Sequence, residues 1–338
     1  MAEITYKDAA HVCEDGETVL DALLRANADI PYSCKKGTCL SCMVQMTEGD
    51  VPQDAQKNIR PSLAQQGYFL ACMCRPSGPL TIAQADDAVI YGRAIVTGID
   101  KMTPDVCRVW LRPSTPLYYR AGQFVNIRRD DGIVRSYSLA SVPRLDRELE
   151  IHVKRMPRGE MSNWFFDQVT PGDGLDLQGP NGDCFYVPGT PDQNLLLIGT
   201  GTGLAPLLGV VRDALDAGHT GNIHLYHGSR EATGIYLADE VRALADTHDN
   251  FHFAPCVSGS AAAGPFRAGR ADEAAFADHP DLKGWSVFIC GYPAMVNAAR
   301  KTAFMAGATL PNIHADPFDF RDLRHEARDE VEDKPDLW

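Results

Sequence analysis

No stretch of this 338-residue sequence approaches the ~18 consecutive apolar residues that a membrane-spanning helix needs. Its first twenty residues carry acidic groups where a secretory signal would need an apolar core. The chain is also short of positive charge: its net charge of −13 argues against nucleic acid, which binds to basic faces. No internal repeat is visible. We therefore expect a cytoplasmic protein with neither a membrane nor a nucleic acid as partner.

The negative charge is concentrated at the two ends of the chain. Residues 1–88 hold 7 basic and 12 acidic side chains, and residues 319–338 hold 4 and 8, so these segments together carry −9 of the −13. An acidic first segment suits docking to a basic face on a partner protein, although a charged surface also simply favours solubility. The charged tail, 319–338, is expected to be a solvated extension.

Three of the ten cysteines fall within nine residues, and a fourth follows thirty residues later. Cys34, Cys39, Cys42 and Cys72 have the C-x4-C-x2-C…C spacing that holds a [2Fe–2S] cluster. A structural zinc site would prefer two C-x2-C pairs, which the C-x-C at Cys72 and Cys74 only half provides. The fourth ligand is Cys72 or Cys74. The segment ending at Cys72 resembles the final ligand segment of plant-type ferredoxins and favours Cys72.

The pattern of expected strands and helices changes twice along the sequence, which predicts a multidomain fold. Residues 1–88 show strands, a helix over 18–27 and then the cysteines, an order that resembles the β-grasp of plant-type ferredoxins. Residues 89–190 contain short alternating segments typical of a small antiparallel β-barrel. Residues 191–318 alternate apolar strands with helices, which indicates an α/β doubly wound parallel sheet.

A four-residue motif, Arg135-Ser136-Tyr137-Ser138, ends one of the expected barrel strands. Alternation places Arg135 and Tyr137 on one face, where a guanidinium beside a ring suits a pyrophosphate next to a flat isoalloxazine. In this position the motif resembles the FAD motif of the ferredoxin–NADP reductase superfamily, a resemblance that covers residues 90–318. It implies that Arg135 pairs with the pyrophosphate, Tyr137 packs on the flavin and Ser138 approaches flavin N5.

The same resemblance implies further flavin contacts. They are Gly159, Met161 and Ser162 before a short helix, which could receive phosphate, the strand residues His152, Val153 and Lys154, and Asp316 and Phe318 in the closing segment. Ser162 could equally be an ordinary helix cap, and His152 a plain strand residue. Relatives of the dioxygenase-reductase type carry Glu at the position of Asp316, and usually stop near Phe318.

A glycine-rich loop follows the first apolar strand of residues 191–318 and opens a helix, where a pyrophosphate can approach the backbone. It resembles the nicotinamide nucleotide loop of the superfamily and comprises Gly199, Thr200, Gly201, Thr202, Gly203 and, on the helix, Pro206. The segment Cys290-Gly291-Tyr292-Pro293 resembles the C-G-x-P of the same superfamily, a resemblance that implies a cysteine beside the nicotinamide ring; a buried structural thiol is the alternative. Arg230 could meet the 2′-phosphate of NADPH, whereas Glu231 could accept from the 2′-hydroxyl of NADH.

Together these features predict an NADH-dependent oxidoreductase with FAD and a [2Fe–2S] cluster. Ser138 and Cys290 are the expected catalytic residues, placed on either side of the hydride transfer. The chain resembles the reductase components of multicomponent oxygenases, such as benzoate dioxygenase and methane or phenol monooxygenase reductases. That resemblance implies a terminal oxygenase as electron acceptor and NADH rather than NADPH as donor. The alternatives are a reductase for a non-oxygenase acceptor, and a non-enzymatic electron carrier or zinc-stabilised binding module.

Overall fold

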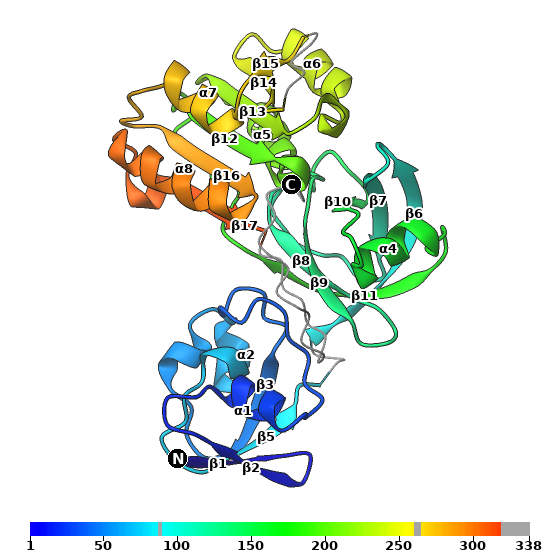
Figure 1. The fold of residues 1–338 in the computed structure, drawn as a ribbon, viewed down its shortest axis with the longest axis vertical. Coiled ribbons are helices and arrows are strands. Elements are labelled where there is room, and N and C mark those ends of the chain that lie inside the picture. Colours follow the sequence, from blue (N-terminus) through cyan, green and yellow to red (C-terminus); the bar gives the residue numbers. More distant parts are fainter. Residues whose placement is uncertain (87–89, 260–264, 319–338) are drawn as a thin grey trace.

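The computed structural model describes residues 1–86, 90–259 and 265–318 and divides them among three sheets. Figure 1 shows the first unit, in blue, set against the end of the barrel, and the parallel sheet beside the barrel. These three sheets confirm the predicted fold class. The boundary predicted at residue 88 and the tail 319–338 lie outside the described residues. None of the helices in the described ranges has the length and apolar composition needed to cross a bilayer.

The first unit is a five-stranded sheet, order β2-β1-β5-β3-β4, packed against helix α1 and the short helix α2. Its helix α1 begins one residue later than expected because the side chain of Thr18 accepts the N–H of Asp21 and caps it. The elements are β1 (Ala2–Tyr6), β2 (Ala9–Cys13), α1 (Val19–Arg25), β3 (Met43–Glu48), α2 (Pro61–Gln65), β4 (Tyr68–Leu70) and β5 (Leu80–Gln84), with 3₁₀ turns at Gln53–Gln56 and Ala71–Met73.

The second unit is an antiparallel sheet of order β10-β7-β6-β11-β8-β9, closed into a barrel by a bridge between Leu139 and Ile151. Val125 and Ile127 of β8 point into the barrel core, so the residues between and beside them face outward. The elements are β6 (Gly92–Lys101), β7 (Val106–Pro113), β8 (Phe124–Arg128), β9 (Val134–Ser138), β10 (Leu149–Lys154), α4 (Glu160–Asp167) and β11 (Gly174–Asn181).

The third unit is a parallel sheet of order β15-β14-β13-β12-β16-β17 with helices on both faces. Its central strand explains the apolar run: Leu195 and Leu197 pack under α5 and α6, whereas Leu196 and Ile198 pack under α7 and α8. The elements are β12 (Leu195–Thr200), α5 (Leu204–Asp216), β13 (Ile223–Ser229), α6 (Ala238–Asp246), β14 (Phe251–Val257), β15 (Arg267–Ala268), α7 (Ala271–Asp278), β16 (Ser286–Gly291), α8 (Pro293–Met305) and β17 (Ile313–Pro317), with 3₁₀ turns at Gly201–Gly203, Ala232–Gly234 and Leu310–Asn312.

Candidate functional site

The cysteine loop, residues 34–42, folds its main chain around its own sulfur atoms. The N–H groups of Lys36 and Cys39 each donate to Cys34 Sγ over 3.3 Å, and Thr38 Oγ1 donates to the same sulfur over 3.3 Å. The N–H of Cys34 in turn donates to Cys39 Sγ over 3.4 Å. Such donors stabilise a thiolate and tune a sulfur-bound metal centre.

The four predicted cysteine ligands are arranged as two pairs. Cys39 hydrogen bonds to Cys34 and, with the loop donors, outweighs burial and lowers the pKa of Cys34 to about 4. In the second pair, a hydrogen bond from Cys42 lowers the pKa of Cys72, and the N–H of Gly37 contributes to the same lowering. Gly37 has a φ of +76°, and a Cβ there would lie only 2.7 Å from the side chain of Met73, so the loop packs this closely only with glycine.

Two pairs suit a binuclear cluster better than a single ion. A structural zinc ion needs four ligands around one point, whereas the contacts of these cysteines group them two by two. A [2Fe–2S] cluster spreads its four cysteines over two irons. Cys74 lies apart from these pairs: burial, with a contribution from Cys13, raises its pKa to about 12. The placement therefore favours Cys72.

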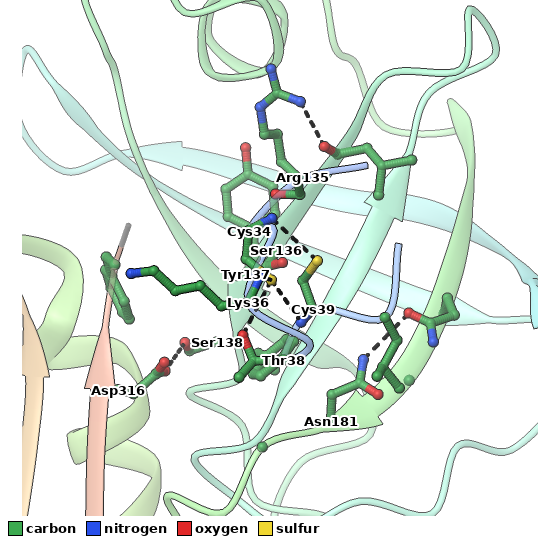
Figure 2. A pocket seen from close by; sticks show the side chains of 18 of the residues that line it. Cys34, Lys36, Thr38, Cys39, Arg135, Ser136, Tyr137, Ser138, Asn181 and Asp316 are labelled. Atoms are coloured by element: carbon green, nitrogen blue, oxygen red, sulfur yellow. Dashed lines mark hydrogen bonds between the residues drawn. The ribbon is translucent and has the colours of Figure 1, made fainter. Parts of the chain in front are cut away.

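A cavity of about 1380 Å³ extends from the cysteine loop across the mouth of the barrel to β17. It is larger than the roughly 300–1,000 Å³ of a typical small-molecule pocket, so it has room for an extended ligand. Figure 2 shows the cysteine loop and the Arg135–Ser138 motif facing the same space. The predicted residues that line it are Cys34, Cys39, Arg135, Ser136, Tyr137, Ser138, His152, Lys154, Gly159, Met161, Ser162, Thr202, Asp316 and Phe318.

Arg135 is suited to an anionic ligand. Its Nη1 donates to the main-chain carbonyl of Val134 over 2.7 Å, and the residue forms part of the cavity wall. Tyr137 points to the same cavity, with its ring edge-on to Phe165 at a centroid distance of 5.6 Å. Burial raises the pKa of Tyr137, so the phenol stays neutral. A guanidinium and a ring thus lie together, as the alternation on β9 predicts.

Around the start of α4, the main chain rather than a side chain is free to bind phosphate. Ser162 is buried, and its hydroxyl accepts the N–H of Met156 over 3.0 Å and donates to the carbonyl of Gly159 over 3.3 Å. The first N–H groups of a helix have no partner within the helix. Arg158, which the sequence reasoning missed, adds a second guanidinium to this part of the cavity wall and has a φ of +58°.

His152 takes part in a buried network that joins the barrel to the parallel-sheet unit. Its Nε2 lies 2.9 Å from Glu150 Oε1 and its Nδ1 lies 2.8 Å from the hydroxyl of Tyr236. Burial alone would raise the pKa of Glu150, but His152 and Arg108 outweigh it and lower that pKa to about 2. His152 thus borders the cavity with both ring nitrogens already engaged.

The two residues after His152 differ in their access to the cavity. Lys154 lines it and pairs with Asp105 over 3.0 Å. The side chain of Val153 is fully buried in the barrel core, so any contact between Val153 and a ligand in the cavity is through its main chain.

The two predicted catalytic residues are linked through Asp316. Ser138 Oγ donates to Asp316 Oδ2 over 3.2 Å, a contact between residues 178 positions apart, which Figure 2 shows at the left of the cavity. Asp316 on β17 pairs in register with Cys290 on β16. Cys290 is fully buried, with its Sγ 3.4 Å from Cys184 Sγ, and burial followed by this contact raises its pKa. A neutral thiol suits packing beside a ring better than nucleophilic attack.

The glycine loop closes tightly on the end of β16. A Cβ on Gly203 would lie 2.4 Å from the carbonyl oxygen of Cys290, and one on Gly291 would lie 2.6 Å from the carbonyl oxygen of Thr200. Of the loop only Thr202 lines the cavity. The other predicted nucleotide residues lie at the carboxyl ends of β12, β13 and β16 or just beyond them, where parallel sheets bind ligands; they are Gly199, Thr200, Gly201, Gly203, Pro206, Arg230, Gly291 and Pro293.

The outer face of the barrel carries a polar group that no sequence motif marks. Asn126 Nδ2 donates to the carbonyl of Cys39 and to Gln178 Oε1, and Ser136 Oγ donates to Asn126 Oδ1 over 2.7 Å. Asn181 Nδ2 approaches Gln178 Oε1 at 3.4 Å. Alternation on the strand identifies Asn126 as outward-facing, but nothing local indicates that another unit covers it.

Family models match all three units. The 2Fe-2S iron-sulfur cluster binding domain matches residues 4–77, the oxidoreductase FAD-binding domain matches 95–186, and the oxidoreductase NAD-binding domain matches 197–301. These matches confirm the predicted cofactors as FAD, NAD and [2Fe–2S].

Relatives match along almost the whole chain. A reductase component of naphthalene 1,2-dioxygenase/salicylate 5-hydroxylase systems from Ralstonia sp. is 33% identical over 90% of this chain and 94% of its own. The aromatic O-demethylase reductase subunit from Amycolatopsis sp. is 35% identical over 90% and 95%. The crystal structure of the Amycolatopsis cytochrome P450 reductase GcoB matches with a TM-score of 0.67, at 33% identity over 94% of this chain and 99% of that one.

Proposed function

The chain belongs to the family of iron–sulfur flavoprotein reductase components of oxygenase systems, and on this premise we propose that it carries electrons from NADH to a terminal oxygenase. The observation that carries the proposal is that the cysteine loop and the Arg135–Ser138 motif border one and the same cavity. When bound, FAD would accept a hydride from the nicotinamide and release electrons singly to the [2Fe–2S] cluster.

In this proposal Cys34, Cys39, Cys42 and Cys72 hold the cluster, in the pairs that their contacts define. The loop N–H groups and Thr38 would continue to donate to the sulfur of Cys34 when it binds iron. Such donors stabilise negative charge on sulfur and so tune the reduction potential.

For FAD, we assign to Arg135 the pairing with the pyrophosphate, and to the main chain at the start of α4 a second phosphate contact. Tyr137 would pack on the flavin. Ser138 would present its hydroxyl to the reacting edge of the flavin, with Asp316 holding that hydroxyl in orientation. Phe318 lines the same cavity and would cover the flavin.

For the nicotinamide nucleotide, the loop 199–203 at the start of α5 would receive the pyrophosphate, and the Cys290 end of β16 would receive the ring. Arg230 and Glu231 are both exposed just beyond β13. A carboxylate there accepts from a 2′-hydroxyl and repels a 2′-phosphate, which supports NADH. The ratio of kcat/KM for NADH and NADPH tests this choice, and a preference for NADPH would overturn it.

We propose the domain boundaries 1–88, 89–190 and 191–318, and a protein acceptor that docks near the cysteine loop. The acidic balance of residues 1–88 supports a basic face on that acceptor. Relatives of this chain are reductase components of naphthalene and terephthalate dioxygenase systems and of an aromatic O-demethylase, which supports an oxygenase as the acceptor.

An anaerobic titration of the purified protein with NADH tests the proposal. The absorption spectrum should contain flavin bands and the broad visible absorption of a [2Fe–2S] cluster, and NADH should bleach both. A protein without either chromophore would be a binding module or a zinc protein rather than a reductase. Reconstitution with candidate oxygenases would then separate an oxygenase from another electron acceptor.

A further inference from the structure

Asn126 is an outward-facing residue of the barrel that is nevertheless completely buried. It lies on β8 between Val125 and Ile127, whose side chains fill the barrel core, so its own side chain must face away from that core. Its exposed fraction is 0%. The cysteine loop packs over the Asn126 side chain and helps to bury it: Asn126 Nδ2 donates to the carbonyl of Cys39, 87 positions away in sequence.

The neighbours of Asn126 extend this contact into a polar row across three strands. Ser136 on β9 and Gln178 on β11 are its cross-strand partners in the sheet register. Ser136 Oγ donates to Asn126 Oδ1, while Asn126 Nδ2 donates to Gln178 Oε1 as well as to Cys39. Figure 2 shows Ser136 and Cys39 on facing elements of the cavity wall. One amide therefore connects the flavin motif to the loop of the cluster cysteines.

The orientation of this amide is fixed by its partners. Both Nδ2 hydrogens point to oxygens that can only accept, a main-chain carbonyl and an amide oxygen. A side chain that offers an acceptor at the same place would leave the Cys39 carbonyl facing another lone pair. Because buried polar groups without a partner are strongly disfavoured, the interface should tolerate such a change poorly.

We propose that Asn126 is a positioning residue that locks the ferredoxin unit onto the barrel, so that the cysteine loop is held beside the flavin site. The proposal rests on the proposed function for its kinetic consequence, but the docking itself can be measured without any electron transfer. Arg60 makes a second hydrogen bond from the ferredoxin unit to the barrel, to the carbonyl of Gly179 over 3.2 Å, but Arg60 is exposed and should contribute less.

The test compares Asn126→Asp, which keeps the shape and replaces the donor by an acceptor, with Asn126→Ala, which adds no charge. The matched control is Asn250→Asp, because Asn250 Nδ2 also donates to two main-chain carbonyls, over 2.9 and 3.0 Å, but within the parallel-sheet unit. Small-angle X-ray scattering of each protein measures whether the ferredoxin unit separates from the barrel.

We expect Asn126→Asp to shift the balance between docked and undocked ferredoxin unit roughly tenfold towards the undocked state, with a larger radius of gyration. Asn126→Ala should follow with a smaller shift, and Asn250→Asp should scatter like the wild type. In stopped-flow measurements, bleaching of the flavin by NADH should keep its rate in both Asn126 variants, while reduction of the cluster slows.

Wild-type scattering from both Asn126 variants would overturn the proposal, as would an equal expansion in Asn250→Asp. Cluster reduction at the wild-type rate in Asn126→Asp would also overturn it. Failure of the proposed function would look different, because the unaltered protein itself would then lack the flavin and cluster bands or would not be bleached by NADH.

Discussion

Replacement of Gly203 by alanine should separate a structural from a ligand-binding role for the glycine loop. Gly203 has a φ of −59°, which alanine adopts readily, so the backbone itself does not require glycine. The added Cβ would, however, lie 2.4 Å from the carbonyl oxygen and 2.7 Å from the carbonyl carbon of Cys290. Both are main-chain atoms of β16, so no side-chain rotation relieves the contact. We expect a loss of ~1–3 kcal/mol in the free energy of unfolding, the usual cost of overpacking.

Gly201→Ala is the matched control for this change. Gly201 has a φ of +53°, and nothing lies within 4 Å of a Cβ built there. Its cost should therefore be backbone strain alone, ~1–2 kcal/mol, and Gly201→Asn should recover part of it because asparagine tolerates this conformation. Gly203→Asn should not recover the stability lost in Gly203→Ala, because its Cβ would meet the same main-chain atoms of Cys290.

The assay is urea unfolding followed by circular dichroism, together with KM for NADH in ferricyanide reduction. Gly203→Ala should lose stability without ligand, and its KM should rise because the loop moves away from β16. If Gly203→Ala kept wild-type stability while KM rose, the clash would be with the nucleotide rather than with Cys290. That result would refute the packing argument.

Three further outcomes are expected. Cys42→Ser should abolish cytochrome c reduction but leave ferricyanide reduction by NADH, and equal loss of both activities would contradict serial electron flow. Arg135→Ala should release FAD on gel filtration at least ~10-fold more readily, because a charged hydrogen-bonding partner of the pyrophosphate is removed, and retention of FAD would argue against this pairing. The pKa of Glu150 is lowered from 4.5 to about 2 on folding, so its charge stabilises the fold above pH 4.5 and this stabilisation disappears as the pH falls towards 2. Thermal unfolding of wild type and Glu150→Gln should therefore differ most near neutral pH and converge in acid; a pH-independent difference would exclude this role.

Contiguous motifs carried most of what could be predicted. Local backbone geometry follows from the spacing of Cys34, Cys39 and Cys42 and from the glycines after an apolar strand. The chemistry of these two motifs can therefore be predicted from the sequence alone. The alternation on β9 likewise anticipated that Arg135 and Tyr137 share a face, since in the sheet register they lie opposite Ile127 and Val125, which both belong to the barrel core. The local sequence pattern predicted the contacts of a side chain less well where that side chain had two possible partners. Ser162 is already engaged by Met156 and Gly159, and the side chain of Val153 packs into the barrel core.

The sequence by itself determined the three units, their order and their cofactors, because each cofactor is recognised by a short segment with its own spacing of cysteines, glycines or strand residues. Only the tertiary structure decided which segments meet: Ser138 with Asp316, Cys184 with Cys290, and Asn126 with Cys39. These contacts join residues 87 to 178 positions apart. Packing between sheets sets them, and packing depends on the shapes of whole units rather than on any local period.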